Sequence, residues 1–377
     1  MKTYDWIVVG GGITGATLAY ELVKLGLSVL LLEKDEISQN ATRYSYGGLA
    51  YWSGSTPFTR QLCQEAIAIY QNLAQELDAD IELRELDLLL TIDTDSNPQA
   101  TAASYANCLT PPHLISVEAA CELEPLLNQK AISGALTVKH GHIHPQKTAQ
   151  AYTQAFLRHG GEMHITEVLQ VKSGTVTTTS TTYSCENVVV CAGGFSRHLL
   201  KAAGIDIKLY FTHAEIIETP PVDVELKTLV MPANLQRFKL EAASTKDDQL
   251  WDELDNQPAP PILDAGAIQF PDGSLRLGQI SRVLTSPYAN INSTASENWL
   301  RQSITKILPK LGNLPGTWHH CLVAFSSTSL PVIGAIPENE GIHIFSGFSN
   351  PLVFVPPLAK RFAKCIKEQE QAIVNVK

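Results

Sequence analysis

Three glycines near the start of the chain have the spacing of a phosphate-binding loop. Gly10, Gly12 and Gly15 form the pattern G-x-G-x-x-G, which permits a tight turn, a close approach of backbone to a pyrophosphate, and close packing of helix on strand. The helix after such a loop offers unpaired N–H groups and a partial positive charge to the phosphates. Glu33 follows about where an acid accepts hydrogen bonds from a ribose. These residues predict a dinucleotide site and leave the choice between NAD and FAD open.

A strand, a helix and a second strand must hold these residues in place. Apolar runs predict strands at Trp6–Gly10 and Ser28–Leu32, and an apolar face predicts a helix at Gly12–Leu25 between them. This βαβ unit is the opening of a Rossmann-type fold. Two later apolar runs, Asn187–Cys191 and Gly341–Ser346, are expected to be further strands of the nucleotide-binding part.

The rest of the chain alternates between helical and β-rich patterns. Helices are predicted at Pro57–Leu77, Ser116–Leu123, Pro145–His159, Trp299–Leu308 and Leu358–Gln371. β-rich stretches are predicted at Glu82–Ile92, Ala131–His144, Thr166–Ser184 and Ile207–Gly278. Nucleotide-domain patterns therefore occur three times, separated by two β-rich insertions.

The composition disfavours several classes of protein. The formal net charge is −10, whereas binding of nucleic acid phosphates needs a basic surface. The apolar runs are shorter than the roughly 20 residues of a membrane span, and residues 1–5 lead directly into a predicted strand, so we expect neither a transmembrane segment nor a signal peptide. Seven cysteines without a C-x-x-C pair favour a reduced, cytoplasmic protein without a disulfide framework. The partner that we expect is a small-molecule substrate. The composition leaves the oligomeric state open.

Together with the glycine loop, four later motifs resemble those of the D-amino-acid-oxidase-like family of FAD-dependent oxidoreductases, which includes glycine oxidase and sarcosine oxidase. They are the small-residue segment Ala41–Leu49, the G-x-I-x-P step Gly141–Pro145, the strand and turn Val188–Ser196, and the C-terminal pair Leu330–Gly334 and Ile344–Phe348. The similarity spans nearly the whole chain. Five motifs in the family's order are more specific than any one of them alone.

The resemblance implies an α/β fold with a Rossmann-type FAD-binding domain and an inserted antiparallel β-sheet substrate domain. The FAD-binding domain is expected at 1–80, 140–206 and 318–377, and the substrate domain at 81–139 and 207–317. The residues expected to contact FAD, held without a covalent link, are Gly10, Gly12, Ile13, Thr14, Gly15, Glu33, Lys34, Thr42, Arg43, Ser45, Gly47, Gly48, Val168, Cys191, Ala192, Gly193, Gly334, Gly347, Phe348, Ser349 and Asn350.

The substrate end of the chain departs from the family pattern. Val323 occupies the position of a substrate-binding arginine in glycine-oxidase-like members, and Phe354 that of a lysine in sarcosine-oxidase-like members. The resulting site is expected to be more apolar than an amino-acid carboxylate requires. Other residues are therefore considered on the substrate side, namely His213, Arg276, Arg282, Asn350, Arg43 and Arg60.

A cysteine and a run of histidines raise two further alternatives. Cys321 matches the position at which sarcosine-oxidase-like members attach the flavin covalently, and a buried structural thiol is the alternative. His140, His142 and His144 alternate along a predicted strand and could hold a metal ion. However, the G-x-I-x-P motif already explains this strand, and no nearby cysteine or acid completes a cluster. We therefore expect no metal site.

The leading hypothesis is an FAD-dependent oxidoreductase that oxidises a C–N bond of a small amino acid or amine by hydride transfer to the flavin, with dioxygen as acceptor. A second hypothesis is an FAD dehydrogenase of a hydroxy acid or apolar alcohol that uses another acceptor. A third is a flavin-holding protein whose substrate site is filled by the altered segment from Asn350 to Phe354. An open cavity of ligand size beside the flavin would contradict the third hypothesis.

Overall fold

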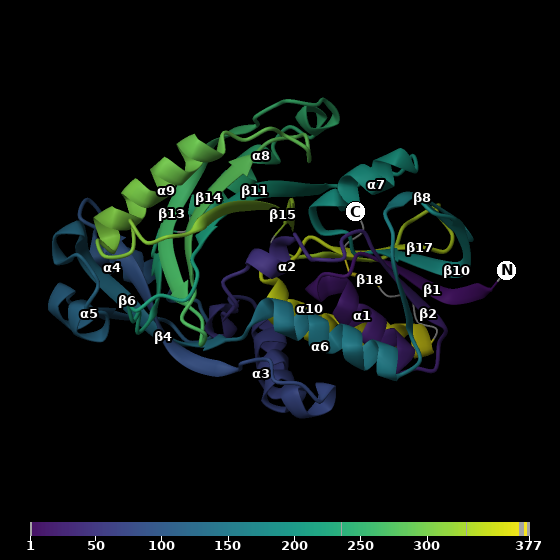
Figure 1. Cartoon of the computed structure of the whole chain (residues 1–377), viewed down its shortest axis with the longest axis horizontal. Coiled ribbons are helices and arrows are strands. Elements are labelled where there is room, and N and C mark those ends of the chain that lie inside the picture. The colour runs from purple at the N-terminus through teal and green to yellow at the C-terminus, as the bar shows by residue number, and fades with distance from the viewer. Residues whose placement is uncertain (1, 235, 329, 369–372, 375–377) are drawn as a thin grey trace.

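The computed structural model describes residues 2–234, 236–328, 330–368 and 373–374. These residues form two nine-stranded sheets that lie beside each other, with helices packed on both (Figure 1). The strands of the first sheet are, in order, β18 (Ile373–Val374), β16 (Val332–Ala335), β17 (Ile342–Ser346), β10 (Thr182–Val190), β1 (Thr3–Val9), β2 (Val29–Glu33) and β7 (Glu162–Ile165), and β9 (Thr175–Thr178) joins β10 to β8 (Val168–Lys172).

The centre of the first sheet is parallel and buried on both faces. β1 pairs in parallel with β10 and β2, β10 with β17, and β2 with β7. Trp6 and Val8 point into one apolar core, and Ile7 and Val9 point into the other. Burial on both faces explains why these strands are continuous apolar runs rather than alternating ones. The four strands predicted for the nucleotide-binding part are confirmed as neighbours in this sheet.

Helices cover both faces of the first sheet. On one face lie α1 (Ile13–Val23), α6 (Pro145–Arg158) and α10 (Pro351–Glu368), and α7 (Ser196–Ala202) lies on the other (Figure 1). α3 (Pro57–Leu77) packs against α10. Its bounds are the predicted ones, because Thr56 and Thr59 form a capping box and Pro57 occupies the first turn.

The start of α10 differs from the prediction. The predicted start is Leu358, but the helix begins at Pro351 and contains Pro356 and Pro357, although proline removes a backbone donor inside a helix. Pro356 cannot donate to the Leu352 carbonyl oxygen four residues earlier. Instead, the Tyr70 hydroxyl donates to that oxygen at 2.6 Å. This contact satisfies the carbonyl that Pro356 leaves without its helical donor.

The second sheet is mainly antiparallel, with β12 and β4 as a parallel pair. Its strands are, in order, β15 (Thr317–Ser326), β11 (Leu209–Glu218), β14 (Leu275–Val283), β13 (Ala259–Gln269), β12 (Leu229–Pro232), β4 (Arg84–Asp93), β6 (Ile132–His142) and β3 (Gly48–Leu49), and β5 (His113–Ile115) pairs with β6. Its outer face packs on α9 (Ser293–Ile307) and α5 (Val117–Leu123), in a cluster that includes Leu300 and Ile304. The predicted fold class is confirmed.

The strands cross two of the predicted domain boundaries. β15 pairs with β11 along its whole length, so residues 318–326 lie in the second sheet although the prediction assigns them to the FAD-binding domain. β6 continues across the boundary between 139 and 140, because it pairs with β4 as far as His142. The division into domains stays a prediction. The predicted helical residues 369–371 lie outside the described residues.

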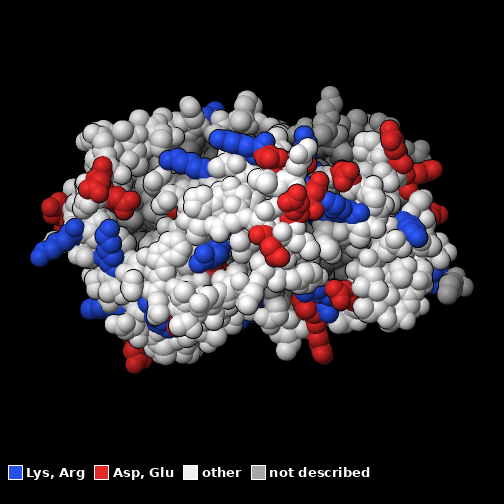
Figure 2. Space-filling model, turned by 90° about the horizontal axis from the view of Figure 1, so that it is seen from above, with Lys and Arg blue, Asp and Glu red and all other residues white. Residues whose placement is uncertain are grey.

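Two observations concern the surface and the possible partners. Acidic and basic side chains are interspersed on the face shown in Figure 2, and basic ones do not gather into one area there. In the described part of the chain, no helix has the length and apolar character that a membrane crossing requires. The exclusion of nucleic acid as a partner stays a prediction.

Candidate active site

A cavity of about 1580 Å³ extends from the first sheet to the second. It begins at the carboxyl ends of β1, β2 and β10, where ligands of open α/β sheets bind. It ends against the strands of the second sheet. The volume exceeds the roughly 300–1,000 Å³ of a site for one drug-sized molecule. The cavity therefore has room for a dinucleotide and a further small molecule.

The glycine loop between β1 and α1 leaves no room for side chains. Gly10 has a φ of +106°, and a Cβ atom there would lie 2.6 Å from a backbone carbonyl oxygen that follows β10. At Gly15 a Cβ atom would lie 1.8 Å from the Gly10 carbonyl oxygen. Gly12 caps α1, and the Ile13 N–H donates to Thr42 Oγ1 at 3.0 Å. The loop thus presents bare backbone at the amino end of α1, which suits a pyrophosphate.

Glu33, at the end of β2, is fixed by backbone groups. Its Oε2 accepts a hydrogen bond from the Gly11 N–H at 2.5 Å, and its Oε1 accepts one from the Asp35 N–H at 3.0 Å. The side chain lines the cavity, where its oxygens can accept the hydroxyl groups of a ribose. Nearby, the Lys34 ammonium lies 4.9 Å from the centre of the Phe195 ring.

The segment after β2 is anchored to the second sheet by ion pairs. Arg43, in α2 (Ala41–Tyr44), binds Glu218 of β11 through two hydrogen bonds of 2.6 and 2.7 Å. Arg276 of β14 is buried, lies 3.5 Å from Glu218, and donates to the Ser45 carbonyl oxygen. These contacts fix the backbone that lines the middle of the cavity.

The three histidines at the end of β6 have structural partners. His140 Nδ1 accepts a hydrogen bond from Trp52 Nε1 at 3.0 Å, His142 Nε2 lies 2.9 Å from the Tyr46 carbonyl oxygen, and His144 caps α6. Burial lowers the pKa of His140 to about 4 and that of His142 to about 3. No group of three potential metal ligands occurs among the residues that the structure describes. The imidazoles serve the packing around the segment 41–49.

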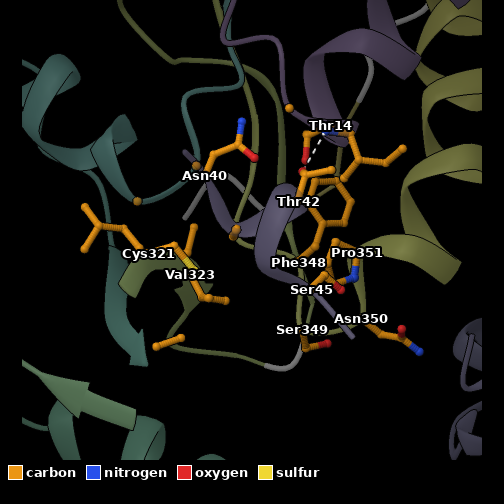
Figure 3. A pocket seen from close by; sticks show the side chains of 18 of the residues that line it. Thr14, Asn40, Thr42, Ser45, Cys321, Val323, Phe348, Ser349, Asn350 and Pro351 are labelled. Atoms are coloured by element: carbon orange, nitrogen blue, oxygen red, sulfur yellow. Dashed lines mark hydrogen bonds between the residues drawn. The ribbon is translucent and has the colours of Figure 1, made fainter. Parts of the chain in front are cut away.

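The second sheet presents an apolar face to the cavity. Alternate residues of its strands line this face, as the two-residue period of a strand requires. They include Leu88 and Leu90 of β4, Ala214 and Ile216 of β11, Leu229 and Met231 of β12, and Cys321 and Val323 of β15, and the sheet also contributes the polar residues Asp264, Gln279, His319 and His320 to the lining. In Figure 3, Cys321 and Val323 lie across the cavity from Ser45 and Ser349. A small molecule held here would be shielded from water.

The C-terminal segment lines the cavity without filling it. Phe348, Leu352 and Phe354 line the cavity and are packed into the core beneath the first sheet. Gly347 has a φ of +79°, and a Cβ atom there would lie 2.7 Å from the side chain of Leu209. The space beside these residues is open. The segment from residue 350 to 354 therefore leaves the cavity open, which counts against the hypothesis of a filled substrate site.

A protein family described as "FAD dependent oxidoreductase" matches residues 5–365. This chain belongs to that family. Its cofactor is FAD, and the predicted family, enzyme class and cofactor are confirmed.

Similar proteins agree with this assignment. The chain is 27% identical over 266 residues to glycine oxidase of Geobacillus kaustophilus, a match that covers 64% of the chain and 70% of that enzyme. The match to glycine oxidase of Bacillus licheniformis, also 27% identical, covers 57% of the chain and 61% of the enzyme, which is less than two thirds of its length.

Solved structures share the fold over almost the whole chain. The crystal structure of the Geobacillus kaustophilus glycine oxidase has a TM-score of 0.79 at 20% identity and covers 100% of this chain and 97% of its own. An L-α-glycerophosphate oxidase from Mycoplasma pneumoniae with FAD bound has a TM-score of 0.76 at 17% identity, and the match covers 98% and 96% of the two chains.

Most of the residues predicted to contact FAD line the cavity. They are Gly10, Gly12, Ile13, Thr14, Glu33, Lys34, Thr42, Ser45, Gly48, Val168, Cys191, Ala192, Gly193, Gly347, Phe348, Ser349 and Asn350. Gly15, Arg43, Gly47 and Gly334 do not line it. Gly15 and Gly47 instead permit close backbone packing, and Gly334 pairs with Ile344 inside the first sheet.

Most of the substrate-side candidates lie away from the cavity. Asn350 lines it, whereas His213, Arg276, Arg282, Arg43 and Arg60 do not. Their side chains have other partners: His213 Nε2 contacts the Ser286 carbonyl oxygen, Arg282 pairs with Glu215, and Arg60 donates to the Asn107 carbonyl oxygen. These residues stabilise the second sheet and its surroundings.

Besides Asp35, Glu167 and Lys239, two charged residues that the motifs did not indicate line the cavity. They are Asp264 of β13 and Arg237 of α8 (Gln236–Ser244). Neither belongs to a family motif. Arg237 forms an i,i+4 ion pair with Glu241, a pattern typical of an exposed helix, so the sequence offered no signal that it faces a cavity.

Proposed function

We propose that this enzyme oxidises the C–N bond of an amino acid or amine by hydride transfer to FAD, with dioxygen as the oxidant. The observation that carries this proposal is the position of Asp264. Among the described residues, the other carboxylates that line the cavity are Glu33, Asp35 and Glu167, which belong to the dinucleotide-binding part. Asp264 alone extends from a strand of the second sheet.

Asp264 has the properties of a base for an amine. Its Oδ1 atom is buried and has no hydrogen-bond partner in the described part of the chain. Burial raises the pKa of Asp264 to about 6, while the charge of Arg237 opposes this rise. A carboxyl group with this pKa is mainly ionised at neutral pH and is well matched to accept a proton there.

The reaction requires an amine with a lone pair. Asp264 accepts a proton from the substrate ammonium group, which leaves a neutral amine. The neighbouring C–H bond then breaks, its two electrons leave with the hydrogen as hydride, and the nitrogen lone pair forms a C=N bond, so the substrate is oxidised. FAD, when bound, supplies the hydride acceptor, and dioxygen takes the two electrons onward as hydrogen peroxide. Water hydrolyses the imine product.

Other features support this class of substrate. Relatives at 25–28% identity carry the names glycine oxidase, dimethylglycine dehydrogenase and peroxisomal sarcosine oxidase, and each of these names refers to an amino acid or its N-methyl derivative. The apolar face of the second sheet would keep water from the reacting carbon and suits a substrate with an apolar body. The cytoplasmic location expected from the composition stays a prediction.

A panel of substrates tests the proposal. FAD-loaded enzyme is mixed without air with amino acids, N-methyl amino acids, primary amines and hydroxy acids, and the flavin absorbance is followed. We expect bleaching by at least one amine or amino acid and stoichiometric hydrogen peroxide after air is admitted. Bleaching by hydroxy acids alone would instead identify a hydroxy-acid dehydrogenase, and slow reoxidation by air would exclude dioxygen as the acceptor.

A further inference from the structure

Arg237 supplies a cation near the apolar end of the cavity. It is the only arginine among the described residues that lines the cavity. Lys34 belongs to the dinucleotide end, and Lys239 is exposed and bound to Asn234. Burial lowers the pKa of His319 and that of His320, so both imidazoles are neutral at neutral pH. Arg237 is therefore the permanent positive charge that faces the substrate end.

The guanidinium of Arg237 is held in place and still has donors to offer. Its Nε atom lies 3.2 Å from Glu241 Oε1, and its Nη2 atom donates to the Ser349 carbonyl oxygen at 3.2 Å. An arginine carries five N–H donors in a rigid fork. The described residues give Nη1 no acceptor. The side chain is only 26% exposed, so an anion bound to it would be largely shielded from water.

Arg237 and Asp264 lie close enough to affect each other. α8 packs on β13, the strand that carries Asp264. The Arg237 charge and a hydrogen bond from its backbone both favour the ionised form of Asp264. A cation and an anion therefore border one apolar space. This arrangement is complementary to a molecule with a carboxylate, an ammonium group and an apolar side chain.

We infer that Arg237 binds the carboxylate of the substrate and that the substrate is an amino acid with an apolar side chain, rather than a simple amine. This inference rests on the proposed function, since it assigns the amino group to Asp264. It also accounts for Val323. The resemblance expects an arginine at this position of β15, but the residue is apolar, and Arg237 of α8 supplies the guanidinium instead. A planar guanidinium can form two parallel hydrogen bonds with a carboxylate whether it extends from β15 or from α8.

Binding of an unreactive acid tests the role of Arg237 without turnover. FAD-loaded wild-type enzyme is titrated with 4-methylpentanoate and with its uncharged amide, and the flavin spectrum reports binding. We expect the acid to bind and Arg237→Gln to weaken it roughly 30- to 100-fold, since a hydrogen bond to a charged group is lost. Binding of the amide should change less than threefold. Arg237→Lys should recover part of the affinity.

The matched control is Lys246→Gln, which removes one exposed positive charge just after α8. It should leave the affinity for the acid unchanged. Each variant must first show the flavin spectrum and melting temperature of a loaded protein, and if Arg237→Gln does not, Arg237→Lys provides the comparison. The inference would be overturned if Arg237→Gln bound 4-methylpentanoate as tightly as the wild type does. It would also be overturned if the wild type bound the acid and its amide equally well.

Kinetics separate this inference from the proposed function. Leucine is compared with 3-methylbutylamine, which lacks only the carboxylate. We expect the wild type to have a much higher kcat/KM for leucine than for 3-methylbutylamine. Arg237→Gln should lose this preference, mainly because the KM for leucine rises. If 4-methylpentanoate binds but no amine or amino acid reduces FAD, the proposed function is refuted and the carboxylate site still stands. Equal turnover of both compounds would refute the carboxylate site alone.

Discussion

Asp264 is the group at the substrate end whose charge changes near neutral pH. It faces Arg237 of α8, and its charge adds to the burial that raises the pKa of Tyr46 and that of Tyr105. Both tyrosines therefore stay protonated and Arg237 stays charged, while the pKa of Asp264 is about 6. We expect kcat/KM to fall as pH drops through about 6, because the protonated acid cannot accept the substrate's proton. A pH profile of the FAD-loaded enzyme measures this.

Substitution of Asp264 separates its catalytic role from its effect on stability. Asp264→Asn should lower kcat/KM by roughly 10²- to 10⁴-fold and remove the acid limb of the profile. In the folded chain the carboxyl group of Asp264 stays protonated up to about pH 6, whereas an unfolded aspartate ionises near 3.9. The folded state therefore loses stability as pH rises between these two values. The variant should thus melt no lower than the wild type at pH 7. An unchanged pH profile would contradict the role.

Cys321 decides whether the flavin can be linked covalently. The thiol lines the cavity, and burial raises its pKa to about 12 despite the opposing charge of Arg276. A thiol that stays protonated is a poor nucleophile. We expect acid precipitation of the yellow protein to leave all flavin colour in the supernatant. Colour retained in the pellet of the wild type and lost in Cys321→Ser would show a covalent link.

The residues of the cavity were predictable at one end only. Gly10, Gly12 and Glu33 were found because a pyrophosphate and a ribose impose backbone conformations and spacings that are local in sequence. Arg237 and Asp264 meet only after α8 packs on β13, and no local pattern encodes that contact. The arginines that seemed suitable by sequence are used in ion pairs, such as Arg43 with Glu218.

Among the elements, the segment around α2 depends on one acid. Glu218 binds Arg43 and lies beside the buried Arg276. Burial acts to raise the pKa of Glu218, but these two cations outweigh it and lower the pKa. Glu218→Gln would leave Arg276 without its counter-charge, so we expect the free energy of unfolding to fall by about 3 kcal/mol. The affinity for FAD should also fall, since Arg43 loses its ion pair with Glu218 and α2 is no longer anchored to the second sheet. Denaturant unfolding and FAD titration measure both effects.

A surface ion pair provides the control for this prediction. Arg361 and Glu65 lie 2.7 Å apart, and each side chain is 35% exposed. Arg361→Gln should change the free energy of unfolding by less than about 1 kcal/mol and leave FAD binding unchanged. Equal effects of both substitutions would mean that Glu218 does not organise the segment.

Long elements were predictable where their ends carry local signals. α3 has a proline in its first turn and a capping box, and its predicted bounds are correct. The start of α10 was not predictable, because a hydroxyl from another helix satisfies the carbonyl that Pro356 leaves unpaired. β15 joins the second sheet through pairing with β11, which is a contact between segments about a hundred residues apart.

In the whole molecule, one cavity extends from the first sheet to the second. Because FAD binds the folded chain alone, it should stabilise that state by about 2.7 kcal/mol at one hundred times its dissociation constant. Removal of FAD should therefore lower the melting temperature, and FAD added back should restore it. FMN should restore less at equal concentration, since it cannot occupy the end of the cavity at Glu33 and Val168. If FAD and FMN stabilised the protein equally, the adenosine half of FAD would not bind at the Glu33 end of the cavity.

The order of strands in the first sheet has a consequence for synthesis of the protein. β1 and β2 are synthesised before β10, and β17, which pairs with β10, is synthesised after it. The segment 347–354 that lines the cavity comes later still. A nascent chain therefore cannot complete the site until residues 347–354 have been synthesised. Products truncated before residue 347 should be colourless, and flavin uptake should report on chains that contain the segment 347–354.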